Sequence, residues 1–345
     1  MILDPILDIF RGRAITIPPL DGAFRANTAL DDAAVFAALP DADNLCQVDG
    51  RLLATSGAEM VALAEGTAPS LVETFPAAVT ALAAASDGTL AVALDDGTLI
   101  EGGRPIAPPA NVACITALAY GADGTLWLAN GSDRHRASGW IADLMEKNAA
   151  GSVWRRPAGG TFARAAANLQ WPYGLLPDAD GGVIVSESWR HRLLRLNGGA
   201  AEPVLSHLPG YPARLSPAAG GGAWLAIFAP RNRLIELVLQ ETHYRYDMMA
   251  EVPRDFWIAP ALSSARSFLE PLQCGAIRTM GVHKAWAPSR SYGLVVRLGA
   301  DLAPLASLHS RANGRRHGTT STIEVGARLL IASQGGDSVL ALEGM

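Results

Sequence analysis

The stretch Trp171–Gly199, WPYGLLPDADGGVIVSESWRHRLLRLNGG, contains an apolar strand, a turn with glycine, and a second strand that begins VIV. Gly181 supplies the positive φ that a tight hairpin turn requires. A strand that is apolar at successive positions is typical of one covered on both faces. The stretch therefore predicts a β-hairpin buried between other layers.

The same hairpin pattern occurs six times along the 345 residues. The copies are NLCQVDGRLLATS from Asn44, ALAAASDGTLAVAL from Ala81, ALAYGADGTLWLAN from Ala117, GLLPDADGGVIVSE from Gly174, RLSPAAGGGAWLAI from Arg214 and STIEVGARLLIAS from Ser321. Their turn positions are Gly50, Gly88, Gly124, Gly181, Gly221 and Ala327. The intervals between these turns are 38, 36, 57, 40 and 106 residues, and three of them are close to the roughly 40 residues of a four-stranded propeller blade. We therefore predict an all-β fold, a six-bladed β-propeller around a central channel.

The two long intervals predict insertions at about 131–150 and 231–288. Apolar residues recur at helical spacing in the first insertion, and the second is also apolar at helical spacing, with prolines that break it. The residues that carry this pattern are Trp140, Ile141, Leu144 and Met145 in the first insertion, and Pro253, Pro260 and Pro271 are the breaks in the second. We expect helices here that form a lid over one mouth of the channel.

The remaining residues fit one domain that spans 1–345. The sixth blade lacks one outer strand, and we expect the N-terminal segment 1–39 to supply it and so partly close the ring. The stretch RAITIPP, residues 13–19, is the predicted strand. Pro18 and Pro19 restrict that strand to a sheet edge, because proline has no N–H to donate.

The composition excludes several classes of partner. A net charge of −5 argues against nucleic acid held through phosphate contacts, and no apolar run reaches the length of a membrane span. Asp4 and Asp8 interrupt the position where a signal peptide needs an apolar segment, and the three cysteines are far apart. We therefore expect a cytoplasmic protein.

Four segments carry a resemblance to a known family: WPYGLLPDADGGVIVSESWRHRLLRL, GYPARLSPAAGGGAWLAI, YGLVVRLGADLAPLASLHS and HGTTSTIEVGARLLIASQGGDSVLAL. From about Asp41 to Leu342 the chain resembles the strictosidine synthase-like proteins. These are six-bladed β-propellers related to the gluconolactonases, senescence-marker lactonases and paraoxonases. The resemblance implies a pocket at one channel mouth, where the first strand of each blade begins. The positions that it singles out as substrate-binding are Asn44, Trp171, Tyr173, Tyr211 and Arg214.

The resemblance also implies two catalytic positions, His317 and Asp43. Strictosidine synthases use a glutamate at the start of the last blade for proton transfer, and His317 stands at the matching position here. A histidine can act as a general base because its unperturbed pKa is near neutrality. The alternative is a histidine that caps a strand or lines the channel without catalysis.

The lactonase relatives hold a divalent cation through a Glu, an Asn and an Asp, which are oxygen ligands suited to hard cations. The matching positions in this sequence are Asp43, Tyr173 and Ala213. Alanine cannot bind a metal, and a neutral phenol is a poor ligand for calcium. We therefore expect no metal or other cofactor at the usual place.

Three functions stay open at this point, each with a small molecule as the partner. The first is a hydrolase of a lactone or ester, with His317 as the base. The second is an enzyme that condenses an amine with an aldehyde, with His317 in place of the synthase glutamate. The third is a propeller that binds a small molecule without catalysis. The sequence gives no indication of the oligomeric state.

Overall fold

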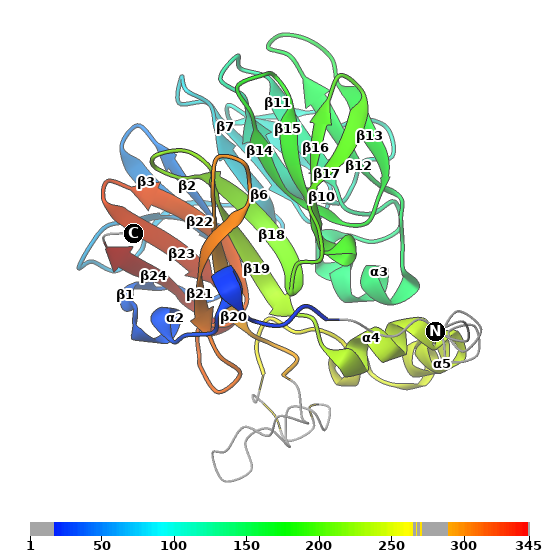
Figure 1. The fold of residues 1–345 in the computed structure, drawn as a ribbon. Helices are drawn as coiled ribbons and strands as arrows, with labels where there is room; N and C mark the ends of the chain where they lie inside the picture. Colours follow the sequence, from blue (N-terminus) through cyan, green and yellow to red (C-terminus); the bar gives the residue numbers. More distant parts are fainter. Residues whose placement is uncertain (1–16, 265–266, 268–269, 271–288, 344–345) are drawn as a thin grey trace.

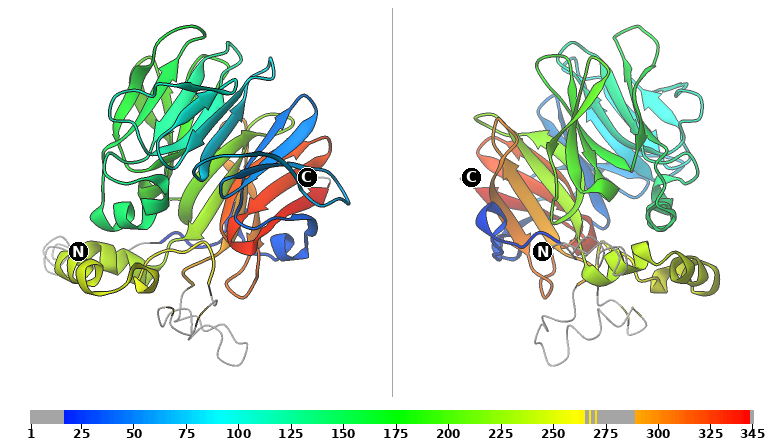
Figure 2. Two further views of the ribbon diagram at one scale, coloured as in Figure 1. Left: turned by 180° about the vertical axis from the view of Figure 1, so that it is seen from behind. Right: turned by 45° about the vertical axis from the view of Figure 1, so that its right-hand side comes forward.

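The computed structural model describes residues 17–264, 267, 270 and 289–343. Twenty-four strands of these residues form six antiparallel sheets of four strands each, arranged around a common axis (Figures 1 and 2). This arrangement confirms the predicted six-bladed β-propeller.

Each blade except the last is made of four consecutive strands. Blade one is β2 (Ala42–Val48), β3 (Arg51–Ser56), β4 (Glu59–Leu63) and β5 (Ser70–Thr74). Blade two is β6 (Val79–Ala84), β7 (Leu90–Leu94), β8 (Leu99–Glu101) and β9 (Arg104–Ile106). Blade three is β10 (Ile115–Tyr120), β11 (Leu126–Asn130), β12 (Gly151–Arg156) and β13 (Ala163–Leu169). Blade four is β14 (Pro172–Pro177), β15 (Val183–Glu187), β16 (Arg192–Asn197) and β17 (Ala200–Leu205). Blade five is β18 (Gly210–Pro217), β19 (Ala223–Pro230), β20 (Gly293–Leu298) and β21 (Pro304–Ser310).

The sixth blade joins the two ends of the described chain. It contains β22 (Thr319–Val325), β23 (Arg328–Ser333), β24 (Ser338–Glu343) and the outer strand β1 (Ala34–Ala38). The prediction that residues 13–19 form this outer strand is wrong, because β1 occupies the position and pairs with β24. Residues 13–16 lie outside the described residues, and residues 17–19 form no strand. AVFAA offers a full set of N–H donors to β24, whereas consecutive prolines do not.

Both insertions contain helices, as their spacing predicts. The first holds α3 (Trp140–Glu146), and the second holds α4 (Arg233–Gln240) and α5 (Thr242–Glu251), which ends just before Pro253. Pro271 lies outside the described residues. The three helices lie at the same end of the propeller (Figures 1 and 2). Side chains of all three join one apolar cluster with Trp189, Tyr211 and Phe228 of blades four and five. Burial of that cluster fixes the helices to this end of the ring.

The innermost strand of every blade is irregular in register, with one shift in each of blades one, two, three, four and six and two shifts in blade five. In blades two, three, four and six the pairing skips one residue, and in blades one and five it skips two. The skipped residues are Thr80, Thr116, Tyr173 and Thr320, with Asn44–Leu45 in blade one and Ala213–Arg214 in blade five. Such bulges redirect side chains out of the sheet pattern and are common beside binding sites.

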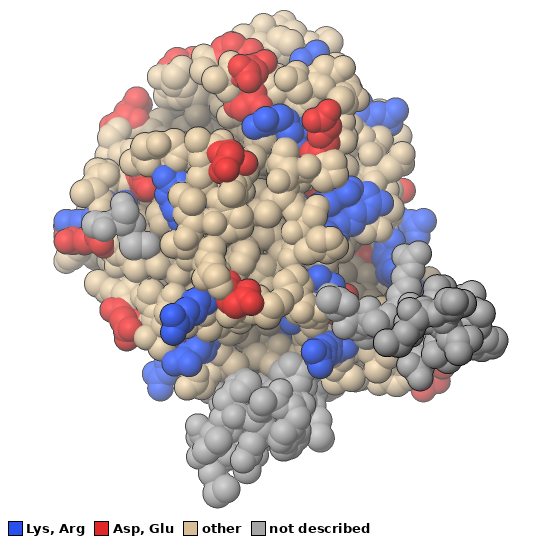
Figure 3. Space-filling view, in the orientation of Figure 1, with Lys and Arg blue, Asp and Glu red and all other residues tan. Residues whose placement is uncertain are grey.

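The surface shows no large area of one charge on the face in Figure 3, outside the grey atoms. Acidic and basic side chains are interspersed there among uncharged residues. Among the described residues, no helix has both the length and the apolar character needed to cross a bilayer.

The short helix α2 (Ala29–Asp32) anchors the segment before β1 to blades five and six. Leu30 is fully buried and packs with Trp224, Leu329 and Leu340. Leu30→Ala should lower the free energy of unfolding by about 2–5 kcal/mol, because it removes buried apolar atoms and leaves a cavity. Chemical denaturation followed by fluorescence measures the change. Leu71→Ala is the control, because Leu71 is 60% exposed and its loss should change little. An equal effect of the two substitutions would contradict this role for α2.

Candidate functional site

A cavity of about 210 Å³ opens where the inner strands of blades one to four begin. It is smaller than the sites that hold drug-sized ligands. Blade residues form its walls, and both insertions border it, the first through Ser138 and Trp140 and the second through Leu262. The blade residues include Asp43, Thr80, Asp95, Thr116, Trp171, Tyr173, Phe228 and Gln334. We call this hollow the channel cavity. Helices α4 and α5 lie beside it and contribute no lining residue, so the predicted lid is confined to α3 and the segment around Leu262.

The polar wall of the channel cavity rests on one ion pair between blade one and blade five. Nη1 of Arg214 donates to both carboxylate oxygens of Asp43, at 2.7 and 3.0 Å. Nη2 of the same guanidinium donates to the carbonyl oxygens of Thr80, at 2.6 Å, and Thr116, at 3.3 Å. Arg214 therefore connects blade five to blades one, two and three. Its planar group matches several acceptors at once, as a lysine ammonium does not.

Tyr173 adds a hydrogen-bond donor to this wall. The guanidinium carbon of Arg214 lies 4.9 Å from the centre of its ring, a cation–π contact. Burial raises the pKa of the phenol to about 12, although the neighbouring Arg214 opposes that rise. The phenol therefore keeps its proton at neutral pH and can donate a hydrogen bond.

Blade four can approach Arg214 closely because residue 174 is glycine. A Cβ at Gly174 would lie 2.4 Å from the carbonyl oxygen of Ala213 and 2.9 Å from Cα of Arg214. Any larger residue would push the two blades apart. The glycine of WPYG thus sets the distance between Tyr173 and Arg214.

Aromatic rings form another part of the wall. Trp171 stacks on Trp189 with 5.2 Å between ring centres, and Phe228 packs edge-to-face with Tyr173 at 5.6 Å and with Trp140 at 5.4 Å. Edge-to-face and stacked pairs fix ring orientations beyond what burial alone requires. The ring contacts therefore hold this part of the cavity wall in a fixed arrangement.

The structure brings together part of the predicted site. Asp43, Trp171 and Tyr173 line the channel cavity, and Arg214 lies directly behind two of them. The side chain of Asn44 instead points away from the cavity into its own blade, where its amide donates to Oγ1 of Thr55 in β3 at 2.9 Å. Tyr211 is fully buried in the apolar cluster under the helices and does not line the cavity.

His317 lies outside the channel cavity, in a separate hollow. Its Nδ1 is 2.8 Å from Oγ of Ser291, and its Nε2 is 2.8 Å from the carbonyl oxygen of Arg311. The side chain is buried, and its surroundings come from the loops before β20 and β22. The structure therefore does not place His317 beside Asp43 and Tyr173, as the general-base prediction requires.

Sequence reasoning missed several lining residues, above all Thr80, Asp95 and Thr116. Thr80 and Thr116 stand at the second residue of an inner strand, the position that Tyr173 holds in blade four. That shared position was a usable signal in blades two and three. Asp95 follows β7, and its carboxylate accepts from the backbone N–H of Ser138 at 3.0 Å, which ties the first insertion to blade two. No pattern in the sequence indicates that contact.

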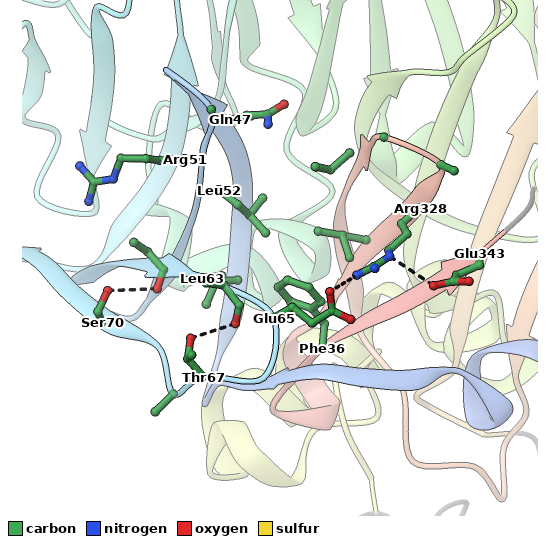
Figure 4. A pocket seen from close by; sticks show the side chains of 18 residues that line it. Phe36, Gln47, Arg51, Leu52, Leu63, Glu65, Thr67, Ser70, Arg328 and Glu343 are labelled. Atoms are coloured by element: carbon green, nitrogen blue, oxygen red, sulfur yellow. Dashed lines mark hydrogen bonds and ion pairs between the residues drawn. The ribbon is translucent and has the colours of Figure 1, made fainter.

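A larger hollow lies elsewhere, a groove of about 1240 Å³ between blades one and six (Figure 4). It lies near the end of β2, whereas the channel cavity lies near its start, so the two are at opposite faces of the ring. Arg328 spans the groove and pairs with Glu65 at 2.8 Å and Glu343 at 3.3 Å (Figure 4). Arg328 thus has both of its acidic neighbours as partners, and we place no site there.

The residues present do not fit a divalent cation at the channel cavity. The described part of the chain has no group of three or more His, Cys, Asp or Glu side chains that could hold a metal. The oxygens that converge there, from Asp43, Thr80 and Thr116, already accept hydrogen bonds from Arg214. A guanidinium supplies the positive charge at this position.

Comparison with solved structures finds the same fold at low sequence identity. A structure described as a putative gluconolactonase is 14% identical, with a TM-score of 0.55, and the match covers 90% of each chain. A gluconolactonase from Xanthomonas campestris is 14% identical with a TM-score of 0.55, over 90% of this chain and 88% of that one. The calcium-binding protein regucalcin from Agrobacterium tumefaciens is 16% identical with a TM-score of 0.53, over 92% and 93%. No protein-family model and no curated protein sequence matches the chain.

The sheet topology and the similar solved structures show a six-bladed β-propeller, a fold that this protein shares with gluconolactonase-like and regucalcin-like structures. At these identities the likeness establishes the fold alone. Membership of the strictosidine synthase-like family stays a prediction from the sequence.

Arg214→Met tests the ion pair. The substitution should lower the free energy of unfolding by about 3–5 kcal/mol, because it leaves the Asp43 carboxylate buried without its counter-charge. The double variant Asp43→Asn/Arg214→Met should recover much of that loss, since no buried charge remains. Urea denaturation of the three proteins measures both effects. Equal stabilities for the single and double variants would show that the pair is not coupled.

Removal of metal ions should leave the fold unchanged. Because Arg214 already binds the oxygens at the centre of the channel, neither a chelator nor added calcium should shift the melting temperature. Differential scanning fluorimetry with and without EDTA measures this, and elemental analysis after dialysis checks for a retained ion. One equivalent of a divalent ion bound through Asp43 would contradict the assignment.

Proposed function

We propose that this protein binds a small lactone or ester in the channel cavity and hydrolyses it. The observation that carries this proposal is that a phenol donor, Tyr173, and a carboxylate, Asp43, line the same cavity and are held by the same guanidinium, that of Arg214. Ester hydrolysis needs a donor for the carbonyl oxygen and a base for the attacking water. The gluconolactonase neighbours carry the name of the same reaction class, which supports the proposal.

The roles follow from the chemistry of each group. Tyr173 donates a hydrogen bond to the carbonyl oxygen of the substrate and stabilises the negative charge that develops there. Asp43 takes a proton from a water molecule as that water attacks the carbonyl carbon, and returns the proton to the leaving oxygen. Arg214 is a positioning residue, because it holds both Asp43 and the ring of Tyr173. The aromatic rings exclude bulk water and orient the ligand.

A non-catalytic binding propeller is the second candidate, and one observation favours it. Both oxygens of Asp43 accept hydrogen bonds from Arg214, so a water molecule would have to share an acceptor that already has a partner. The condensation of an amine with an aldehyde has less support. It requires His317 at the channel cavity, and His317 lies in a different hollow.

Hydrolysis can be tested with a panel of five- and six-membered lactones and small aryl esters, with acid release followed in a pH-stat. Tyr173→Phe should lower kcat by about 100- to 1000-fold, the usual cost of one oxyanion donor. Asp43→Asn should lower it by about 100-fold or more. Tyr120→Phe is the matched control, because its hydroxyl donates to Glu101, at the far end of β10 from Thr116.

Two outcomes would change the assignment. Loss of activity in Asp95→Asn but not in Asp43→Asn would move the base to Asp95, the other carboxylate of the cavity. Ligand binding seen by calorimetry, with no turnover of any panel member, would overturn the hydrolase proposal in favour of the binding propeller.

A further inference from the structure

The described lining of the channel cavity carries an excess of negative charge. Two carboxylates line the cavity, those of Asp43 and Asp95. The charge of Asp43 is balanced by Arg214, which lies behind the wall with its Nη1 at 2.7 Å from Oδ1 of Asp43. Among the described residues that line the cavity, none is a lysine, an arginine or a histidine. The charge of Asp95 is therefore left for a ligand to balance.

Asp95 has room for a further partner. It stands directly after β7 and is half-buried. Its Oδ1 accepts from the backbone N–H of Ser138 at 3.0 Å, whereas its Oδ2 has neither a hydrogen bond nor an ion pair with any described residue. A carboxylate can accept at both oxygens, and it attracts a cation more strongly where water is partly excluded. A positively charged group of a ligand would find its counter-charge here.

Four aromatic side chains line the same cavity, those of Trp140, Trp171, Tyr173 and Phe228. The ring of Phe228 meets the rings of Trp140 and Tyr173 at interplanar angles of 84° and 80°, with 5.4 and 5.6 Å between ring centres. The face of an aromatic ring attracts a cation through its quadrupole, most strongly in tryptophan. Several rings around one space are the arrangement by which proteins recognise methylated ammonium groups.

One hydrogen bond holds the carboxylate and the tryptophan at the same part of the wall. Ser138, whose backbone N–H binds Asp95, lies just before Trp140, the first residue of α3. The first insertion is thereby tied to blade two, with its tryptophan in the lining of the cavity. The two groups that would contact a cation come from different segments, and the carboxylate itself makes the contact that joins them.

The acceptors already in use favour an ammonium group without N–H donors. A primary ammonium has three N–H donors, and each needs an acceptor when the group is buried. The carboxylate of Asp43 and the carbonyl oxygens of Thr80 and Thr116 already accept from Arg214. A quaternary ammonium donates no hydrogen bond and is held by opposite charge and by ring faces. The cavity therefore suits the quaternary group better.

We propose that the channel cavity recognises a quaternary ammonium group, so that its substrate is a small carboxylic ester whose alcohol part carries this group. Asp95 and Trp140 hold the ammonium, while Tyr173 and Asp43 act on the ester group. The inference rests on the hydrolase function proposed above and names its substrate class. Water attacks the acyl carbon, the ester C–O bond breaks, and the leaving oxygen takes the proton that the water gave up. The products are the carboxylic acid and the alcohol, with the ammonium unchanged.

The test separates charge from shape with two probes, choline and 3,3-dimethylbutan-1-ol, in which a carbon replaces the nitrogen. Isothermal titration calorimetry on the whole purified chain measures both affinities. Choline should bind about 10-fold more tightly, because only choline has a charge for Asp95 and the ring of Trp140. Choline has no ester bond, so its binding does not depend on hydrolysis. Equal affinities, or tighter binding of ethanolamine than of choline, would overturn the proposal.

Variants test which residues read the charge. Asp95→Asn keeps an oxygen acceptor for the N–H of Ser138, and it should lower the ratio of choline affinity to neutral-alcohol affinity by about 10-fold. Trp140→Leu should lower the same ratio. Asp96→Asn is the matched control and should keep it, because Asp96 is exposed, accepts from the N–H of Thr98 at 2.8 Å and is not a lining residue. The ratio is compared because a general loss of structure weakens both ligands alike. An unchanged ratio in Asp95→Asn would contradict the assignment.

The substrate class and the hydrolase function fail in different ways. Acetylcholine should be hydrolysed with a kcat/KM about 10-fold above that of its neutral analogue 3,3-dimethylbutyl acetate, as a pH-stat measures. Equal kcat/KM values for the two esters would overturn the ammonium site and support the hydrolase. A preference for choline in binding, with no hydrolysis of either ester, would support the ammonium site and overturn the hydrolase.

Discussion

One guanidinium group holds the centre of this propeller together. Arg214 of blade five binds the carboxylate of Asp43 in blade one and the carbonyl oxygens of Thr80 and Thr116 in blades two and three. It also lies over the ring of Tyr173 in blade four. Backbone carbonyls at the bulged ends of strands have no sheet partner, so a buried cation there satisfies acceptors that would otherwise be costly to bury. Five blades therefore depend on a single side chain.

This arrangement decides what kind of chemistry the channel cavity can perform. A divalent ion at the same place would leave open coordination positions for a substrate, whereas the guanidinium directs its donors at protein oxygens. The groups left for a ligand are the phenol of Tyr173, the carboxylates of Asp43 and Asp95, and the surrounding rings. In the hydrolysis that we propose, polarisation of the substrate carbonyl comes from the neutral hydrogen bond of the Tyr173 phenol. The surrounding aromatic rings exclude water, and a hydrogen bond from the phenol is stronger where water is excluded.

The second insertion borders two hollows, the channel cavity and the separate hollow that contains His317. Its helices α4 and α5 pack on the apolar cluster at the end of blades four and five, and the chain then returns across the channel mouth through Leu262 and Ser264. Movement of this one segment would change both spaces, since Leu262 borders one and Ser264 the other. Gly318 and Gly335 allow the contact that holds it. The second insertion, which interrupts blade five in the sequence, thus contributes to the walls of both hollows.

The sequence by itself determined the architecture. Each blade repeats the same pattern of strand, glycine turn and strand at intervals near 40 residues. This pattern depends on neighbouring residues only, so it can be recognised in the sequence without a structure. The outer strand β1 was misplaced because RAITIPP also contains β-forming residues and its prolines are tolerated at a sheet edge, so the pairing of AVFAA with β24 was needed to decide between them. The site was readable in part, since Asp43, Trp171 and Tyr173 stand where inner strands begin. Only the tertiary structure could show that Arg214 binds Asp43 and the carbonyl groups of two other blades, that Asn44 and Tyr211 turn away from the cavity, and that His317 lies in a separate hollow beside Ser291. These contacts join residues far apart in sequence, where bulges and blade packing, not periodicity, set the direction of each side chain.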